Sequence, residues 1–141
     1  MKIILDTNVL LIALPSRSPY HGIIQAFNSR QYDLIVTTSI FLEYEEILSE
    51  KANPFIANIV LSAFLEAPNV ITVTEYYNWN LIKTDPDDNK FTDAFLNGHA
   101  NYLVTNDAHF DIVKSVKFPR IDILSANEFL AFLKTGKKNK I

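Results

Sequence analysis

The sequence predicts an α/β fold, namely a three-layer α/β/α sandwich around a central, mostly parallel sheet of 4–5 strands. Short runs rich in β-branched residues alternate along the chain with segments in which apolar residues recur at helical spacing. This alternation is typical of a parallel sheet covered by helices on both faces. The chain has 141 residues, 48% of them hydrophobic, which suffices for one domain with a sizeable core. We expect a single domain over residues 1–134 and a basic, flexible tail over residues 135–141.

The first part of the chain is predicted to hold two strands with helical turns between them. Residues 2–5 form a buried strand, and the apolar run at residues 9–14 forms one or two helical turns that Pro15 ends. Residues 20–29 carry apolar side chains at helical spacing, and residues 33–37 form the second strand.

The middle of the chain is predicted to hold two helices and a third strand. Ser39 is a suitable N-cap for a helix of about ten residues, because its hydroxyl can accept a hydrogen bond from an unpaired amide. A second helix with an apolar face begins at Asn53-Pro54, and Pro68 ends it. Residues 70–73 form the third strand.

The last part is predicted to hold two strands and two helices. The segment at residues 85–88 is a turn and cap signal before a helix that ends near Gly98. Residues 102–105 and 121–124 form the fourth and fifth strands. Residues 125–128 resemble a capping box for the last helix, which runs through Leu133.

Composition excludes several functional classes. The absence of cysteine rules out disulfides, zinc–thiolate sites and thiol nucleophiles. No glycine-rich phosphate loop is present, which argues against nucleotide-triphosphate and dinucleotide enzymes. Because no segment is long and apolar enough to span a membrane and none matches a secretory signal, we expect a cytoplasmic protein without membrane contact. The net charge of −3 is unlike that of most nucleic-acid binders, although bound metal would neutralise several of the acids.

Four acidic residues, Asp6, Glu43, Asp88 and Asp107, each follow an apolar or turn segment. Open α/β sheets bind ligands at the C-terminal edge of their strands, and carboxylates that converge there repel one another. A hard divalent cation, which prefers oxygen ligands, would relieve this repulsion, so the sequence suggests a metal-dependent hydrolytic site. Each acid also has a structural alternative as a helix cap, a turn residue or part of a solvated helix face. Glu46 is the alternative ligand to Glu43, because residues three apart share a helix face.

The segments around these acids resemble the motifs of PIN domains, in the same order. Residues 3–10 resemble the opening of that family, and residues 38–48 resemble its second acidic motif. Residues 88–91 and 102–107 resemble the third and fourth motifs. The likeness is to the VapC-like subgroup of toxin components. The resemblance implies a Mg²⁺- or Mn²⁺-dependent ribonuclease that cleaves RNA with metal-activated water. It also implies a cognate antitoxin as partner, and a homodimer is a further expectation.

The resemblance assigns the following roles: Asp6, Glu43, Asp88 and Asp107 are catalytic residues and metal ligands, and Asn8 and Thr105 give polar support. Asp93, five positions after Asp88, is an additional or substitute ligand. We favour Asp88 because a helix N-terminus suits a negative group, and Asp87 is its rival by one residue. Asn106 stands where many family members have glycine, and asparagine tolerates the left-handed conformation better than most residues.

Three further residues are candidates for contact with RNA. Arg17 and Tyr20 lie in a segment near the expected active edge, where Arg contacts and aromatic stacking suit single strands. His109 follows Asp107 by two residues. The alternative for all three is an ordinary loop or surface role.

Two other functions compete with the nuclease. A haloacid-dehalogenase-like phosphatase also begins with an acid after its first strand, but it needs a second Asp two residues later, where this chain has Asn8. A catalytically weak PIN-like binding module is the non-enzymatic alternative. The exposed side of residues 55–64 is a candidate partner surface in either case.

Overall fold

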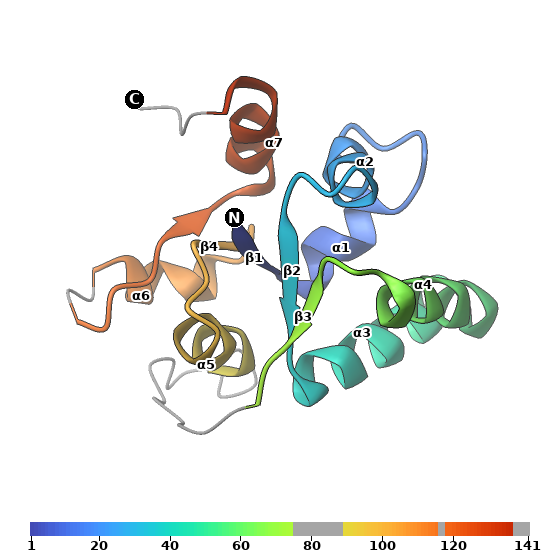
Figure 1. Cartoon of the computed structure of the whole chain (residues 1–141), viewed down its shortest axis with the longest axis horizontal. Coiled ribbons are helices and arrows are strands. Elements are labelled where there is room, and N and C mark those ends of the chain that lie inside the picture. The colour runs from blue at the N-terminus through green and yellow to red at the C-terminus, as the bar shows by residue number, and fades with distance from the viewer. Residues whose placement is uncertain (75–88, 116–117, 137–141) are drawn as a thin grey trace.

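The sheet has five strands, all parallel, in the order β3-β2-β1-β4-β5 (Figure 1). The structure is a computed structural model that describes residues 1–74, 89–115 and 118–136. The strands are β1 (Lys2–Leu5), β2 (Asp33–Val36), β3 (Val70–Thr72), β4 (Tyr102–Val104) and β5 (Ile123–Leu124). The three-layer α/β/α prediction is confirmed, and every strand pair in the described residues is parallel.

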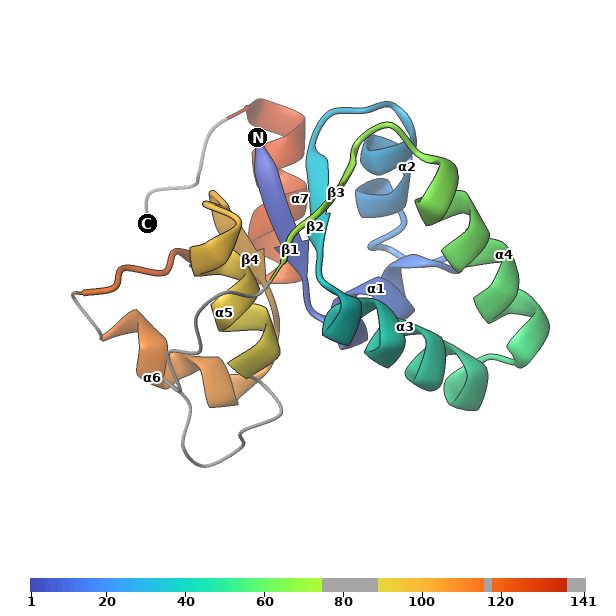
Figure 2. The ribbon, with the colours of Figure 1, turned by 60° about the horizontal axis from the view of Figure 1, so that its bottom comes forward.

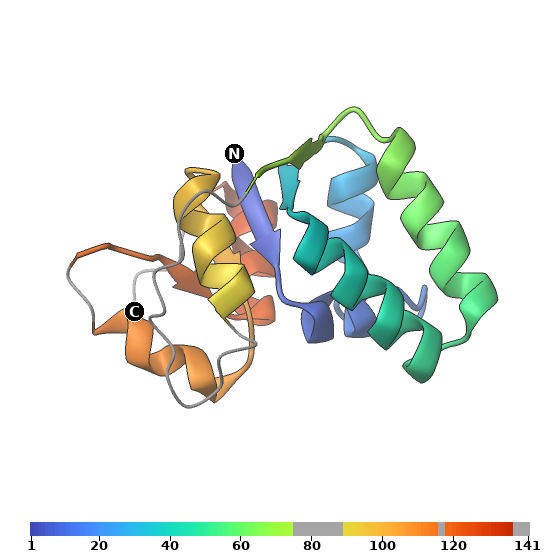
Figure 3. The same ribbon diagram turned by 90° about the horizontal axis from the view of Figure 1, so that it is seen from below.

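Helices connect the strands and cover both faces of the sheet. They are α1 (Thr7–Ala13), α2 (Gly22–Asn28), α3 (Thr38–Lys51), α4 (Pro54–Glu66), α5 (Asn89–Asn97), α6 (Asp111–Lys114) and α7 (Ala126–Thr135), with the 3-10 turn η2 (Ala108–Phe110) before α6. Helix α5 packs on β4, β1 and β2, whereas α1, α2 and α7 gather on the other face (Figures 2 and 3). Helices α3 and α4 pack against each other as a hairpin beside the β2–β3 end of the sheet.

The core is formed by β-branched strand residues and by aromatic side chains from the surrounding helices. Phe27 contacts Phe64 edge-on at a ring-centroid distance of 5.3 Å, and Tyr32 contacts Phe129 in the same way at 5.2 Å. The first pair joins α2 to α4, and the second joins the segment just before β2 to α7. Phe91 of α5 meets Phe110 of η2 at 6.3 Å on another part of the molecule. Aromatic pairs of this geometry add modestly to the stabilisation from burial.

Several predicted boundaries are wrong by a few residues. Thr37 rather than Ser39 caps α3, because its hydroxyl accepts a hydrogen bond from the Ile40 amide, and the helix is 14 residues long rather than about ten. Helix α1 begins at Thr7, directly after β1, and not at residue 9. The fifth strand is limited to Ile123–Leu124. Helix α6 and the turn before it were not expected, because segments this short leave no periodic pattern.

The start of α7 agrees with the prediction, and its end at Thr135 lies two residues beyond the predicted Leu133. Ser125 and Glu128 form the expected capping box, in which each side chain accepts a hydrogen bond from the other residue's amide. Gly136, which follows the helix as its C-cap, has a φ of +70°. The predicted turn at residues 85–88 and the tail beyond residue 136 lie outside the described residues. Among the described helices, none combines the length and apolar character that a membrane crossing requires.

Candidate active site

The acidic site is built at the C-terminal ends of β1 and β4, which are neighbours in the centre of the sheet (Figure 3). Chain order reverses here, because β1 leads to β2 on one side while β4 is reached only after β3 on the far edge. Such a switch point is where open α/β sheets bind ligands. Asp6 is the residue after β1, and its amide continues the ladder with a 2.9 Å hydrogen bond to the Val104 carbonyl.

Asp6 is buried, at 5% exposed, and it is held by a residue of the neighbouring strand end. The Thr105 hydroxyl donates a 2.7 Å hydrogen bond to Asp6 Oδ2, and the Asp107 amide donates a 3.0 Å hydrogen bond to the same hydroxyl oxygen. Asp6 occupies the N-cap position of α1, but its side chain makes no capping hydrogen bond. The alternative of a simple helix cap therefore does not explain this carboxylate.

The electrostatics of Asp6 show that three of the predicted acids lie near one another. Burial raises the pKa of the Asp6 carboxyl above its ordinary value, and the hydrogen bond from Thr105 partly offsets that effect. The carboxylates of Asp107 and Glu43 raise the Asp6 pKa further. A buried acid whose charge is opposed by two neighbouring acids is typical of a site that binds a cation or a proton.

Glu43 projects from α3 toward Asp6, and both of its carboxylate oxygens are engaged. The Thr7 hydroxyl donates to Oε2, and the Lys90 ammonium lies 3.0 Å from Oε1. The Glu43 and Lys90 side chains are each 20% exposed. Glu46, the alternative ligand on the same helix, is exposed, so the structure favours Glu43.

Tyr44 fixes α3 against the end of β1. Its hydroxyl donates a 2.6 Å hydrogen bond to the carbonyl of Leu5, the residue before Asp6, and its ring is fully buried. Burial is the main cause of its raised pKa, with smaller contributions from Asp6, Tyr32 and Glu43, so Tyr44 is a neutral hydrogen-bond donor. This contact sets the distance between the elements that carry Asp6 and Glu43.

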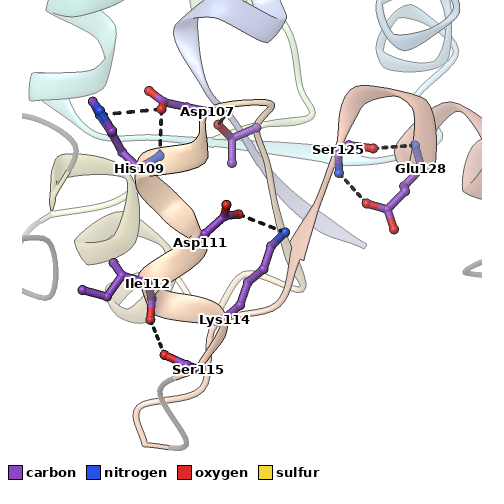
Figure 4. A network of polar contacts seen from close by, with 9 residues as sticks. Asp107, His109, Asp111, Ile112, Lys114, Ser115, Ser125 and Glu128 are labelled. Carbon is purple, nitrogen blue, oxygen red and sulfur yellow. Dashed lines mark hydrogen bonds and ion pairs between the residues drawn. The ribbon is translucent and has the colours of Figure 1, made fainter.

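Asp107 is half-buried and lies beside His109 (Figure 4). The His109 amide donates a 2.9 Å hydrogen bond to Asp107 Oδ1, and the His109 Nδ1 atom lies 3.6 Å from the same oxygen. Asp107 thus caps the η2 turn, as its structural alternative predicted, while it also lies within electrostatic reach of Asp6. Among the described residues, His109 is the predicted RNA contact that lies against a predicted acid.

The remaining predicted site residues differ in their exposure. Asn8 is exposed in the first turn of α1, whereas Asp93 is buried on α5, the helix that packs on β1 and β4. Within the described part of the chain, no hydrogen bond or ion pair joins Arg17 or Tyr20 to the acids. The Tyr20 amide instead donates a local hydrogen bond to the Ser18 hydroxyl. The third acidic position, predicted at Asp88 with Asp87 as its rival, lies outside the described residues.

Asn106 does not adopt the left-handed conformation that asparagine tolerates. The non-glycine residues with positive φ in the described chain are Arg30 and His99, so Asn106 is not in the left-handed conformation. Instead its side-chain oxygen accepts a 2.9 Å hydrogen bond from the Ala126 amide. Asn106 therefore ties the loop that carries Asp107 to the first turn of α7.

Sequence reasoning missed three residues that organise the acids, namely Thr7, Tyr44 and Lys90. Each sits one or two positions from a predicted acid, so its place in the sequence was a usable signal. The spacing could not show which acid each residue contacts, since Lys90 binds a carboxylate 47 positions earlier in the chain.

The donor chemistry suits a hard divalent cation, although the side chains as they lie do not enclose one. Carboxylate oxygens from Asp6, Glu43 and Asp107 are the ligands that Mg²⁺ and Mn²⁺ prefer. In the described ranges, however, no three Asp, Glu or His side chains are grouped closely enough to hold a metal ion. Asp6 and Asp107 are the residues that would hold the cation, and Glu43 would join them only by exchanging its present partners.

A buried acid at the switch point of a parallel sheet, surrounded by further acids, places this chain among α/β proteins with a carboxylate-lined edge. The comparisons with known proteins give the family. The PIN domain model matches residues 2–109, and the chain belongs to this family, whose members are generally nucleases. The comparison with curated proteins gave no match.

The fold is also similar to that of a solved structure. The chain aligns with one chain of the crystal structure of VapBC2 from Rickettsia felis bound to a DNA fragment from their promoter, with a TM-score of 0.62. The alignment covers 89% of this chain and 98% of the other, at 15% sequence identity. At this identity the likeness establishes the fold.

Proposed function

We propose that the protein is a Mg²⁺- or Mn²⁺-dependent endoribonuclease and the toxin of a toxin–antitoxin pair. The observation that carries the proposal is the buried Asp6 carboxylate, whose pKa is raised by burial and by Asp107 and Glu43, at the ligand-binding edge of a PIN domain. A metal-dependent nuclease needs such an anionic pocket to hold a cation against the substrate phosphate. RNA as substrate places the protein in the cytoplasm.

The chain's own residues divide the work as follows. Asp6 and Asp107 bind the cation, and Thr105 orients Asp6 through its 2.7 Å hydrogen bond. Glu43 and the third acid, Asp88 or Asp93, complete the anionic pocket. When bound, the cation supplies charge stabilisation and a more acidic water. His109, exposed beside Asp107, is the RNA-contacting side chain that the geometry favours over Arg17 and Tyr20.

The partner surface proposed for an antitoxin is the exposed apolar patch of α4, defined by Phe55, Ile56 and Ile59. These side chains are 72%, 36% and 50% exposed, although helix residues of this kind are normally buried. The three lie within one turn of the helix and so form a continuous patch. Exposed apolar patches mark protein–protein contact surfaces more often than they mark free surface.

RNA cleavage by the wild type and by Asp6→Asn, each with Mn²⁺ and with EDTA, tests the proposal. The substitution keeps the shape of the side chain and its acceptor for Thr105 but removes the negative charge. We expect the wild type to cut RNA with Mn²⁺ only, and the variant to be slower by more than about 100-fold, since even outer residues of metal sites contribute about 10–100-fold. Cleavage by both proteins would indicate a contaminating nuclease. Absence of RNA cleavage by both proteins would contradict the proposal.

One observation favours a binding module as the second candidate. Glu43 is already satisfied by Thr7 and Lys90, and the described residues contain no ready-made metal cluster. A binding module would show no gain in thermal stability with Mn²⁺, whereas a site that binds the cation only in the folded state would. For the phosphatase alternative, the position that needs a general acid holds Asn8, which is exposed and cannot donate a proton in that role.

A further inference from the structure

A lysine side chain contacts one carboxylate of the acidic site. Lys90, in the first turn of α5, places its ammonium 3.0 Å from Glu43 Oε1, and both side chains are only 20% exposed. Other ion pairs of the described residues are more solvated: Lys114 and Asp111, for example, are 55% and 65% exposed (Figure 4). The Lys90 side chain is therefore less exposed to solvent than an ordinary surface lysine.

The location of this pair decides its electrostatic effect. Glu43 raises the pKa of Asp6, so the carboxylate that Lys90 contacts belongs to the group of mutually repelling acids. A lysine at 3 Å reduces that repulsion, and a pair this little exposed is screened less by solvent and salt than one at the surface. The ammonium thus neutralises the negative charge of Glu43, as a bound divalent cation would.

The second oxygen of Glu43 supports the same conclusion. Thr7 donates its hydroxyl to Oε2, so that the carboxylate is oriented by one neighbour and neutralised by the other. A cation that bound Glu43 at Oε1 would lie close to the Lys90 ammonium, and the two positive charges would repel each other. In the metal-free protein, both oxygens of Glu43 therefore already have a partner among the described residues.

We propose that Lys90 is the internal counter-ion of the acidic site, which stabilises the metal-free protein and competes with the divalent cation for Glu43. The metal part of this inference rests on the proposed function, whereas the counter-ion part does not. Lys90 is a positioning residue here, since it acts through Glu43 and need not touch the substrate. It also sets the metal concentration at which the site fills.

The test measures Mn²⁺ binding by titration calorimetry, and thermal unfolding with EDTA and with saturating Mn²⁺, for Lys90→Met and Lys90→Arg. Methionine keeps the apolar stem and removes the charge, and arginine keeps the charge. We expect Lys90→Met to bind Mn²⁺ about fivefold more tightly, the change that corresponds to losing an ion pair worth about 1 kcal/mol. The same variant should unfold at a lower temperature in EDTA, with the difference removed by saturating Mn²⁺. Lys90→Arg should resemble the wild type in both measurements.

Two controls separate this role from a general effect of charge. Lys114→Met makes the same chemical change in the exposed pair with Asp111, so it should alter neither Mn²⁺ affinity nor the effect of EDTA. Glu43→Gln removes the partner, so adding Lys90→Met to it should no longer tighten Mn²⁺ binding. Coupling of this kind is what a double-mutant cycle measures.

The outcomes distinguish this inference from the proposed function. If the wild type binds Mn²⁺ but Lys90→Met binds it no more tightly, the competition is refuted and the nuclease proposal stands. If the wild type binds no Mn²⁺, the proposed function fails, and the EDTA measurement still decides the counter-ion role. Equal unfolding temperatures for Lys90→Met and Lys114→Met in EDTA would refute that role as well.

Discussion

At the scale of single residues, the site is arranged so that function and stability oppose each other. Asp6 is buried and charged beside two other acids, and burial is the first cause of its raised pKa. A carboxyl with a raised folded-state pKa favours folding while it is protonated, and this contribution is lost as the pH rises through that pKa. The metal-free protein therefore tolerates Asp6 at a cost, which the hydrogen bond from Thr105 reduces.

Tyr44 offers a prediction at the residue scale because the chain supplies a matched control. Tyr44 donates to the Leu5 carbonyl and Tyr32 donates to the Ile23 carbonyl, and both rings are buried. We expect Tyr44→Phe and Tyr32→Phe each to lower the free energy of unfolding by about 1–2 kcal/mol, since each removes a buried hydrogen bond to a backbone carbonyl. Urea denaturation measures this change.

Of the two tyrosines, Tyr44 is the one that positions the acids, so the two variants should differ in RNA cleavage. We expect Tyr44→Phe to slow cleavage by about tenfold, as is usual for residues that support a metal site, and Tyr32→Phe to leave it unchanged. Equal cleavage by the two variants at equal stability would show that the contact with Leu5 is structural only.

At the scale of elements, what the sequence predicted depends on how local the signal is. The strand at residues 2–5 and the capping box of Ser125 and Glu128 are determined by neighbouring residues, and both were predicted correctly. Helix α6 has 4 residues and the last strand has 2, which is too short for a periodic pattern to predict them. Boundaries such as the start of α3 depend on which of several hydroxyl residues caps the helix, and Thr37 does so because it directly follows β2.

For the site, the sequence predicted the acids and the supporting Thr105, but not the partners of Glu43. Asp6, Glu43 and Asp107 were found because each follows an apolar run, which is a local feature. The pair between Lys90 and Glu43 joins α5 to α3, and no spacing within either helix indicates it. Side-chain contacts between distant elements depend on the packing of the whole fold, so the electrostatic balance of the site became visible only in the structure.

Asn106 gives a prediction at the element scale. Its side chain links the end of β4 to the first turn of α7 by a 2.9 Å hydrogen bond to the Ala126 amide. We expect Asn106→Ala to lower the free energy of unfolding by about 1 kcal/mol, because that amide loses its partner. Asn127→Ala, an exposed change in the same turn, is the control and should be neutral. Thermal unfolding compares the two, and equal midpoints would show that the capping box alone holds this end of α7.

At the scale of the whole molecule, the acidic edge of the sheet and the proposed partner surface lie on different elements. The acids come from the ends of β1 and β4 and from α3, whereas the α4 patch of Phe55, Ile56 and Ile59 belongs to the other arm of the helical hairpin (Figure 2). Substitutions in the α4 patch should therefore separate partner binding from cleavage.

We expect Phe55→Ser combined with Ile59→Ser to weaken binding to a co-expressed antitoxin at least about tenfold, because apolar anchors carry much of the binding energy of an interface. RNA cleavage and the unfolding temperature should change little, since the two side chains are 72% and 50% exposed in the free chain. Asn58→Ser, an exposed polar change on the same helix, is the matched control. Any small protein encoded next to this gene is the partner to test, by co-purification and light scattering. Unchanged binding by the double variant would exclude α4 as the antitoxin surface, and a fall in the mass of the isolated chain would assign the patch to a homodimer instead.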